Sequence, residues 1–156
     1  MLAAFDFGIT NTDVIINSDN KNTYYTFPSE SINNQFIDKI FNSINVNVSE
    51  IKKISVTGGK SSNLDNKYKG VPIIKINEVE AIGLGAIALY DIAKKPFVAV
   101  SAGTGTACVY HKNGNFNHLG GISVGGGTLQ GLSKQLINTK KPKDIEDLAK
   151  NGNRKK

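Results

Sequence analysis

Two segments in which an apolar strand turns through small polar residues into a second strand constrain the fold of this chain most. The first is FDFGITNTDV (5–14), and the second is VSAGTGTACV (100–109). In both, glycine permits a tight backbone turn, and hydroxyl and amide side chains add hydrogen-bonding groups without bulk. A third segment, GGISVGGGTLQGLSKQL (120–136), leads from a glycine triplet into a helical pattern.

These three segments have in common a set of backbone N–H groups that small residues leave accessible. Such groups bind anions, both in turns and at the start of a helix. Asp6, at the end of the first strand, would add a carboxylate, which suits a cation held together with phosphate oxygens. Each segment alone is also compatible with an ordinary turn that satisfies its own backbone. Together and in this order, they indicate phosphate binding.

The rest of the chain alternates between β-rich and helical patterns, which is typical of an α/β protein. Asn77 and Glu80 form a helix-capping pattern, which leaves Glu78 free in the first turn of its helix. Helical spacing predicts one helix that is capped by Ser31 and ends near Ile44, and others over 78–93, 128–136 and 144–150. β-Rich runs predict strands, the first three as an antiparallel meander, at 2–7, 13–16, 23–27, 51–56, 71–76, 96–100, 106–110 and 116–119.

The charge of the chain is concentrated at its C-terminal end. Of the 156 residues, 39% are hydrophobic, enough to bury a core of one domain or slightly more. Residues 140–156 hold seven Lys or Arg and three acids, a net of +4, so the remainder carries 12 − 10 = +2 of the total +6. No aromatic residues are interleaved with this tail, so we expect no nucleic-acid partner. Without a signal-peptide or membrane-span pattern, we expect a cytoplasmic protein with no membrane partner.

Three other kinds of site lack the residues that they require. The segment TGGKSS contains Gly59, Lys60 and Ser61, but Ile54 stands where a P-loop needs its first glycine. No strand opens into the G-x-G-x-x-G of a dinucleotide-binding fold. Cys108 is the single cysteine, so no disulfide or thiolate metal site can form, and we expect it to pack as a small hydrophobic residue.

The segments DFGITNTD, VTGGKSS, KINEVEAIGLGA, VSAGTGTACV and HLGGISVGGGTLQGLSKQL together resemble type II pantothenate kinases, which belong to the acetate and sugar kinase, Hsp70 and actin superfamily. The resemblance implies phosphorylation of pantothenate by ATP and Mg²⁺, the first step toward coenzyme A, with ATP between two ribonuclease-H-like lobes. It predicts a first lobe over 1–94 with a mixed five-stranded sheet, and the beginning of an incomplete second lobe over 95–156. A homodimer is implied where the C-terminal half is present.

The same resemblance assigns roles to individual residues. Glu78 matches the family's catalytic glutamate, and the helix dipole would keep a carboxylate in the first turn ionised. Asp6 would act on magnesium through water. Thr104 would lie near both nucleotide and pantothenate, and His118 takes the position of a substrate-binding arginine. The residues expected to bind nucleotide are Gly8, Ile9, Thr10, Asn11, Thr12, Asp13, Val14, Ile15, Thr104, Gly126, Gly127, Thr128, Leu129 and Gln130.

The sequence departs from the family pattern at three positions. Ile9 replaces the second glycine of the D-x-G-G-T loop, and Asp13 stands near the place of a lysine. A neutral imidazole at His118 cannot make the two-pronged charged contact of an arginine. His118 therefore puts the affinity for the substrate or its identity in question. The changes in the first loop do not exclude nucleotide binding, because Hsp70-like proteins also lack the second glycine.

Members of the family run on for about another domain, so we interpret the chain as an N-terminal portion. An incomplete second lobe would leave an exposed sheet edge and apolar patches. One alternative is a truncated, non-catalytic nucleotide-binding fragment or a subunit of a split kinase. Another is a sugar or amino-sugar kinase of the same superfamily, although the cysteines of the zinc motif that many of those have are absent. A purely structural role for Glu78 at the helix start also stays open.

Overall fold

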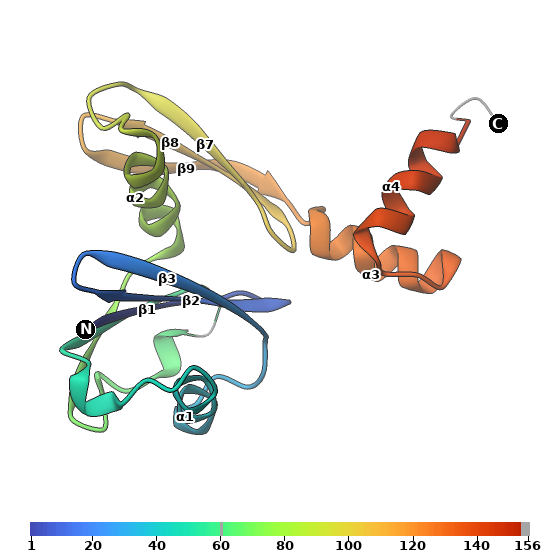
Figure 1. Ribbon diagram of the computed structural model, residues 1–156. Coiled ribbons are helices and arrows are strands. Elements are labelled where there is room, and N and C mark those ends of the chain that lie inside the picture. The colour runs from blue at the N-terminus through green and yellow to red at the C-terminus, as the bar shows by residue number, and fades with distance from the viewer. Residues whose placement is uncertain (60, 154–156) are drawn as a thin grey trace.

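The computed structural model describes residues 1–59 and 61–153 and has two sheets with four α-helices (Figure 1). Lys60, in the TGGKSS segment, and residues 154–156, at the end of the predicted second lobe, lie outside the described residues. The first sheet contains β1 (Leu2–Phe7), β2 (Asn11–Ser18), β3 (Lys21–Pro28), β4 (Lys53–Thr57), β5 (Lys67–Tyr68) and β6 (Val71–Lys75). Two short 3₁₀ turns, η1 (Val48–Glu50) and η2 (Ser61–Asn63), connect its strands.

The first sheet is mixed, and its strands lie in the order β3-β2-β1-β4-β6-β5. The meander β1-β2-β3 is antiparallel, whereas β1, β4 and β6 run parallel. The predicted α/β fold with a ribonuclease-H-like mixed sheet is confirmed. The sheet has six strands instead of the expected five, because the two-residue β5 pairs with β6, and a strand that short leaves no sequence pattern.

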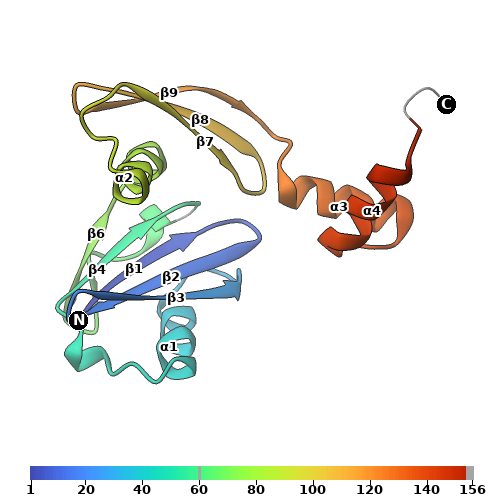
Figure 2. The ribbon, with the colours of Figure 1, turned by 45° about the horizontal axis from the view of Figure 1, so that its top comes forward.

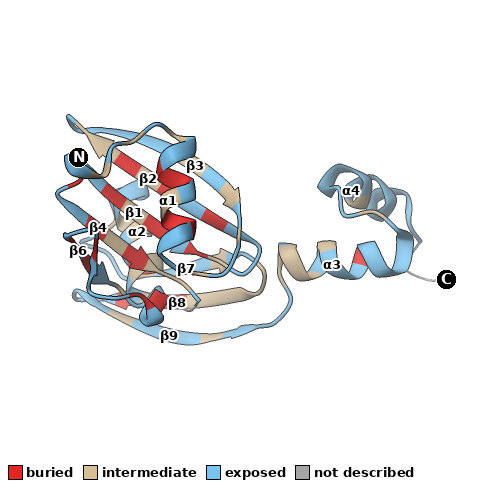
Figure 3. Ribbon diagram, turned by 90° about the horizontal axis from the view of Figure 1, so that it is seen from below, coloured by how far each residue is buried: buried red, intermediate tan, exposed pale blue. Residues whose placement is uncertain are grey.

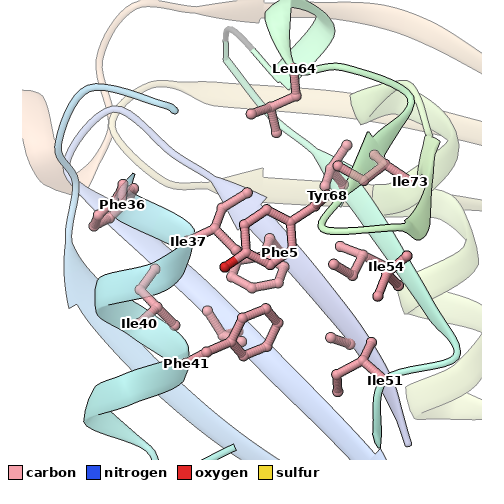
Figure 4. Close-up of a cluster of buried hydrophobic side chains, with 14 of the residues drawn as sticks. Phe5, Phe36, Ile37, Ile40, Phe41, Ile51, Ile54, Leu64, Tyr68 and Ile73 are labelled. Carbon is pink, nitrogen blue, oxygen red and sulfur yellow. The ribbon is translucent and has the colours of Figure 1, made fainter. Parts of the chain in front are cut away.

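Helix α1 (Asn34–Ser43) covers one face of this sheet and builds the core. Phe36, Ile37, Ile40 and Phe41 are buried against Phe5 and other strand residues (Figures 3 and 4). Each such side chain contributes about 1.5–3 kcal/mol by leaving water. The helix is capped not by Ser31, as predicted, but by Asn33, whose side chain accepts a hydrogen bond from the Phe36 N–H.

Helix α2 (Glu78–Tyr90) lies between the first sheet and a second sheet formed by β7 (Phe97–Ala102), β8 (Thr106–Lys112) and β9 (Asn115–Ile122) (Figures 1 and 2). Gly83 is buried against the ring of Phe116, so the helix rests directly on β9. The helix ends three residues before the predicted position, because Asp91 adopts a left-handed conformation (φ 50°, ψ 45°).

Helices α3 (Gly126–Ile137) and α4 (Pro142–Asn151) extend away from the two sheets (Figures 1 and 3). Large apolar side chains are exposed on the second sheet and on α3. They include Val98 and Val100 on β7, Ile122 on β9, and Leu132 and Leu136 on α3. Cys108 on β8 is half-buried. The lobe boundary between residues 94 and 95 stays a prediction.

No helix within residues 1–59 and 61–153 is long and apolar enough to cross a membrane.

Candidate functional site

A cleft of about 540 Å³ opens where both sequence turns and the start of α3 meet. The β1-β2 turn, which lies between Phe7 and Asn11, forms one wall, and the β7-β8 turn, which lies between Ala102 and Thr106, forms the other. Gly58 and Gly59 after β4 and Glu78 at the start of α2 also line it. The cleft is thus lined by strand ends and turns from both sheets and by the first residues of two helices.

In the first wall, Ser29 donates hydrogen bonds to two carbonyl groups of the β1-β2 turn. The Ser29 hydroxyl donates to the Gly8 carbonyl at 2.6 Å, and the Ser29 N–H donates to the Thr10 carbonyl at 3.0 Å. Thr12, which is buried, pairs its hydroxyl with that of Ser29 at 3.0 Å. A Cβ at Gly8 would lie 2.6 Å from the carbonyl oxygen of Asn11, so only glycine fits there. The turn is therefore held in one conformation, with its carbonyl groups paired within the protein.

The second wall is locked to helix α3 by its backbone. The Gly127 N–H donates to the Gly103 carbonyl at 3.1 Å, and the Thr128 N–H donates to the Thr104 carbonyl at 3.1 Å. The Thr128 hydroxyl also donates to the Thr104 carbonyl, at 2.8 Å. The expectation that the N–H groups at the start of α3 are free to face the cleft is therefore wrong for Gly127 and Thr128. Both N–H groups instead donate to carbonyl groups of the β7-β8 turn, which lie within hydrogen-bond distance.

A side-chain hydrogen bond joins the two walls. The hydroxyls of Thr10 and Thr104 are 2.9 Å apart and share a hydrogen bond. A Cβ at Gly127 would lie 2.9 Å from the Thr10 hydroxyl and 3.0 Å from the Thr104 Cα. Both turns and α3 can approach this closely only because residue 127 has no side chain.

The floor of the cleft is acidic. Asp6 on β1 and Asp13 on β2 are paired across the strands, so both carboxylates lie on one face of the sheet. Burial, and then the negative charges of Glu78 and Asp13, raise the pKa of Asp6 above its ordinary value. Asp13 is oriented by the Thr26 hydroxyl, which donates to it at 2.6 Å. Among the described lining residues there is no cationic side chain.

Glu78 is the first residue of α2, and its carboxylate belongs to the cleft. The predicted capping pattern holds in part: the Asn77 side chain accepts from the Glu80 N–H at 2.8 Å, and its amide donates to the Glu80 carboxylate at 3.4 Å. Glu80 is engaged at the cap, whereas no hydrogen bond to another described residue occupies the carboxylate of Glu78. The Glu78 carboxylate is therefore available to a ligand in the cleft.

The structure brings most of the predicted site residues to this cleft, although their roles stay predictions. Those that line it are Asp6, Gly8, Ile9, Thr10, Asn11, Asp13, Glu78, Thr104, Gly126, Gly127 and Gln130. Thr12 and Val14 are buried behind the first turn and Ile15 is half-buried on β2. Thr128 and Leu129 follow on α3, and His118 is exposed on β9, with none of these three among the lining residues.

A sequence model of the Fumble family matches residues 91–156. A type II pantothenate kinase of Bacillus thuringiensis subsp. konkukian is 39% identical over 76% of this chain and 44% of its own length. Another from Staphylococcus epidermidis is 29% identical over 99% of this chain and 56% of its own. The resemblance to type II pantothenate kinases is confirmed. The chain spans about half the length of these curated relatives.

Solved structures at low sequence identity share the fold of this pantothenate kinase-like chain. Component A of the Acidaminococcus fermentans (R)-2-hydroxyglutaryl-CoA dehydratase has a TM-score of 0.65 at 15% identity, over 95% of this chain and 56% of its own. The activator of the Clostridium difficile 2-hydroxyisocaproyl-CoA dehydratase, solved with bound ADPNP, has a TM-score of 0.57 at 18% identity, over 88% of this chain and 52% of its own. The actin-like ATPase fold is therefore shown.

Sequence reasoning missed Gly58 and Gly59 as lining residues of the cleft. A Cβ at Gly58 would lie 2.5 Å from the Asp6 carboxylate, and both glycines have positive φ angles, of 77° and 37°. A usable signal existed, because β4 pairs in parallel with β1. The carboxyl ends of parallel neighbours meet at one edge of a sheet, so a glycine pair after β4 has to lie beside Asp6.

The cleft fits a divalent cation that arrives with a polyphosphate. No group of three or more His, Cys, Asp or Glu capable of holding a metal occurs among the described residues. Magnesium commonly keeps several waters and takes one or two carboxylates together with substrate phosphates, so the Asp6 carboxylate would fit such an ion, directly or through water. A bare polyphosphate would be repelled by Asp6, Asp13 and Glu78, which gives the cation a clear electrostatic role.

Proposed function

We propose that this chain carries the nucleotide-binding and catalytic part of a pantothenate kinase, which transfers the γ-phosphoryl group of ATP to pantothenate. The observation that carries the proposal is that Glu78, Asp6 and both glycine turns line one cleft. We take pantothenate as the acceptor because the relatives are named type II pantothenate kinases. This chain spans about half of their length, so the whole reaction is proposed for it.

In the proposed reaction each group of the cleft has one task. Backbone amides of the two turns bind phosphate oxygens, and the glycines allow them to approach closely. Glu78 accepts a hydrogen bond from the hydroxyl of pantothenate, orients it and takes its proton as the bond to phosphorus forms. Magnesium, when bound, neutralises phosphate charge, and Asp6 would hold it. As a user of ATP, the protein would act in the cytoplasm, and we propose no nucleic-acid or membrane partner.

The test is phosphoryl transfer from MgATP with pantothenate or N-acetylglucosamine as acceptor. We expect turnover with pantothenate, and a loss of about 10²–10⁴-fold in kcat for Glu78→Gln. Glu80→Gln is the matched control, because a glutamine side chain can keep the hydrogen bond at the helix cap. We expect the turnover rate of this variant to stay near that of the wild type. If neither acceptor stimulates turnover, or if Glu78→Gln is as active as Glu80→Gln, the kinase proposal is wrong.

A second candidate is a non-catalytic nucleotide-binding portion that acts only with a complementary polypeptide. The exposed apolar side chains of β7, β9 and α3 favour it, because apolar surface that a partner could cover often marks a protein–protein interface. The same assay separates the two candidates. MgATP binding without turnover under any acceptor would support the second.

A further inference from the structure

Four polar side chains form a row across the first sheet, on the face away from α1. The row consists of Thr26 on β3, Asp13 on β2, Asp6 on β1 and Thr57 on β4, and each residue is paired in register with the next. Neighbours in register project from the same face of a sheet. The opposite face is identified by Phe5 and Val56, which are paired in register and buried in the core with α1. The two carboxylates in the middle of the row line the cleft.

At one end of the row, the carboxylate has a hydroxyl partner. The Thr26 hydroxyl donates to the Asp13 carboxylate at 2.6 Å. The two residues lie directly opposite each other on neighbouring strands. The sheet thus already contains one threonine–aspartate pair, in which a hydroxyl orients a charged carboxylate.

At the other end of the row, the corresponding pair is not formed. The Thr57 hydroxyl oxygen is buried, and within residues 1–59 and 61–153 it is the only buried side-chain nitrogen or oxygen without a hydrogen-bond partner. Its neighbour Asp6 is affected by burial and by the charges of Glu78 and Asp13, with no hydrogen bond among these influences. Buried hydroxyls in proteins nearly always have a partner, so an unpaired one needs an explanation.

The Asp6 carboxylate lies close enough to the end of β4 to become that partner. A Cβ at Gly58, the residue after Thr57, would lie 2.5 Å from the Asp6 Oδ1 atom. Thr57 itself is in register with Asp6, and neighbouring strands lie about 4.8 Å apart. Rotation about side-chain bonds, without movement of either strand, can therefore bring the hydroxyl and the carboxylate together.

We infer that Thr57 is a positioning residue of the cation site, and that its hydroxyl donates to the Asp6 carboxylate when magnesium is bound there. This inference rests on the proposed function. Carboxylates that bind metal ions are in general oriented by hydrogen bonds from neighbouring groups. Thr57 would then orient Asp6 as Thr26 orients Asp13. The unpaired hydroxyl is thus a donor that the cation-free protein holds in reserve.

The first test is calorimetric titration of the magnesium complex of a nonhydrolysable ATP analogue into the wild type, Thr57→Val and Thr57→Ser. We expect Thr57→Val to bind the complex about 10-fold more weakly, because it lacks a hydrogen bond to a charged group. Thr57→Ser keeps the hydroxyl and should bind as the wild type does. Ser55→Ala is the matched control. Ser55 lies on the same face of β4 but is paired in register with Ala4, which has no carboxylate, so the affinity should not change.

The stability of the protein without magnesium is the second readout, because a structural role would change it in the opposite direction. Valine has nearly the shape of threonine and leaves no buried hydroxyl unpaired. Thr57→Val should therefore have a Tm at least as high as that of the wild type in differential scanning calorimetry. A lower Tm would show that the hydroxyl already has a partner, and the inference would be wrong.

The remaining outcomes separate the inference from the proposed function. Equal affinity of Thr57→Val and the wild type for the magnesium complex overturns the positioning role and leaves the kinase proposal standing. Binding by Thr57→Ser that is as weak as that by Thr57→Val has the same meaning, because the hydroxyl would then play no part. If the wild type does not bind the magnesium complex, both the inference and the kinase proposal are wrong.

Discussion

At Asp6, the carboxylate charge that we propose for holding magnesium also lowers the stability of the fold. Asp6 shares one face of the sheet with Asp13, and burial followed by the charges of Glu78 and Asp13 raises its pKa from an ordinary value of 3.8. The pKa of Asp6 is higher in the folded protein than in the unfolded chain. At a pH above the pKa of the folded protein, the ionised carboxylate therefore destabilises the fold. That destabilisation disappears as the pH falls through the folded pKa toward the unfolded value.

We predict that Asp6→Asn raises the Tm of the metal-free protein at pH 7 and reduces the dependence of the Tm on pH between about 4 and 7. The same substitution should abolish the increase in Tm that MgATP gives to the wild type. Differential scanning calorimetry across this pH range measures both effects. Asp65→Asn, an exposed carboxylate outside the cleft, is the control. A lower Tm for Asp6→Asn at pH 7 would contradict the assignment of repulsion to Asp6.

Gly127 is the residue at which the three predicted phosphate segments converge. A methyl group there would lie within about 3 Å of Thr10 and Thr104, as the 2.9 and 3.0 Å separations indicate, and would force the two turns apart. We predict that Gly127→Ala weakens MgATP binding about 10-fold or more, because overpacking of this kind costs about 1–3 kcal/mol. Isothermal titration measures the change. Gly131→Ala, one turn further along α3, meets no atom within 4 Å and should bind MgATP as the wild type does.

At the scale of elements, the packing of α2 on β9 depends on another glycine. A Cβ at Gly83 would lie 2.1 Å from the Phe116 ring, whereas one at Gly85 would meet no atom within 4 Å. We predict that Gly83→Ala lowers the free energy of unfolding by about 1–3 kcal/mol. Gly85→Ala in the same helix should raise it by up to about 1 kcal/mol, because alanine favours a helix. Chemical denaturation of both variants measures this, and equal stabilisation would refute the close contact.

Strand patterns in the sequence predicted the first three strands well, whereas the start of helix α1 was predicted two residues too early. The run at 2–7 and the two that follow it have strong β-forming residues between clear turns, and they became β1, β2 and β3. Ser31 and Asn33 are both good N-caps, so the local sequence could not choose between them. The structure uses Asn33, and the four apolar residues of α1 that follow it then face the sheet.

The candidate site was predictable wherever a glycine turn follows a strand. Both turns and Glu78 were predicted and do line one cleft. Gly58 and Gly59 were missed, because their place depends on which strands are neighbours and not on any local pattern. His118 matches a motif position in the sequence, but it is exposed on β9 and is not among the described residues that line the cleft, so its role stays a prediction.

At the scale of the whole molecule, a hydrogen bond between the walls links the two sheets across the cleft. The hydroxyls of Thr10 and Thr104 form it, and they come from turns that belong to different sheets. Phosphate oxygens that enter between the walls would compete for both hydroxyls. We therefore expect the two turns to respond to nucleotide as one unit.

The most direct test is an NMR titration of the chain with the magnesium complex of a nonhydrolysable ATP analogue. We predict that the backbone amide resonances of Gly8, Gly103 and Gly127 shift together and follow a single binding curve. The resonance of Gly114, in the distant β8-β9 turn, should stay unchanged. Shifts confined to one turn, or separate binding curves for the two turns, would contradict a shared phosphate site.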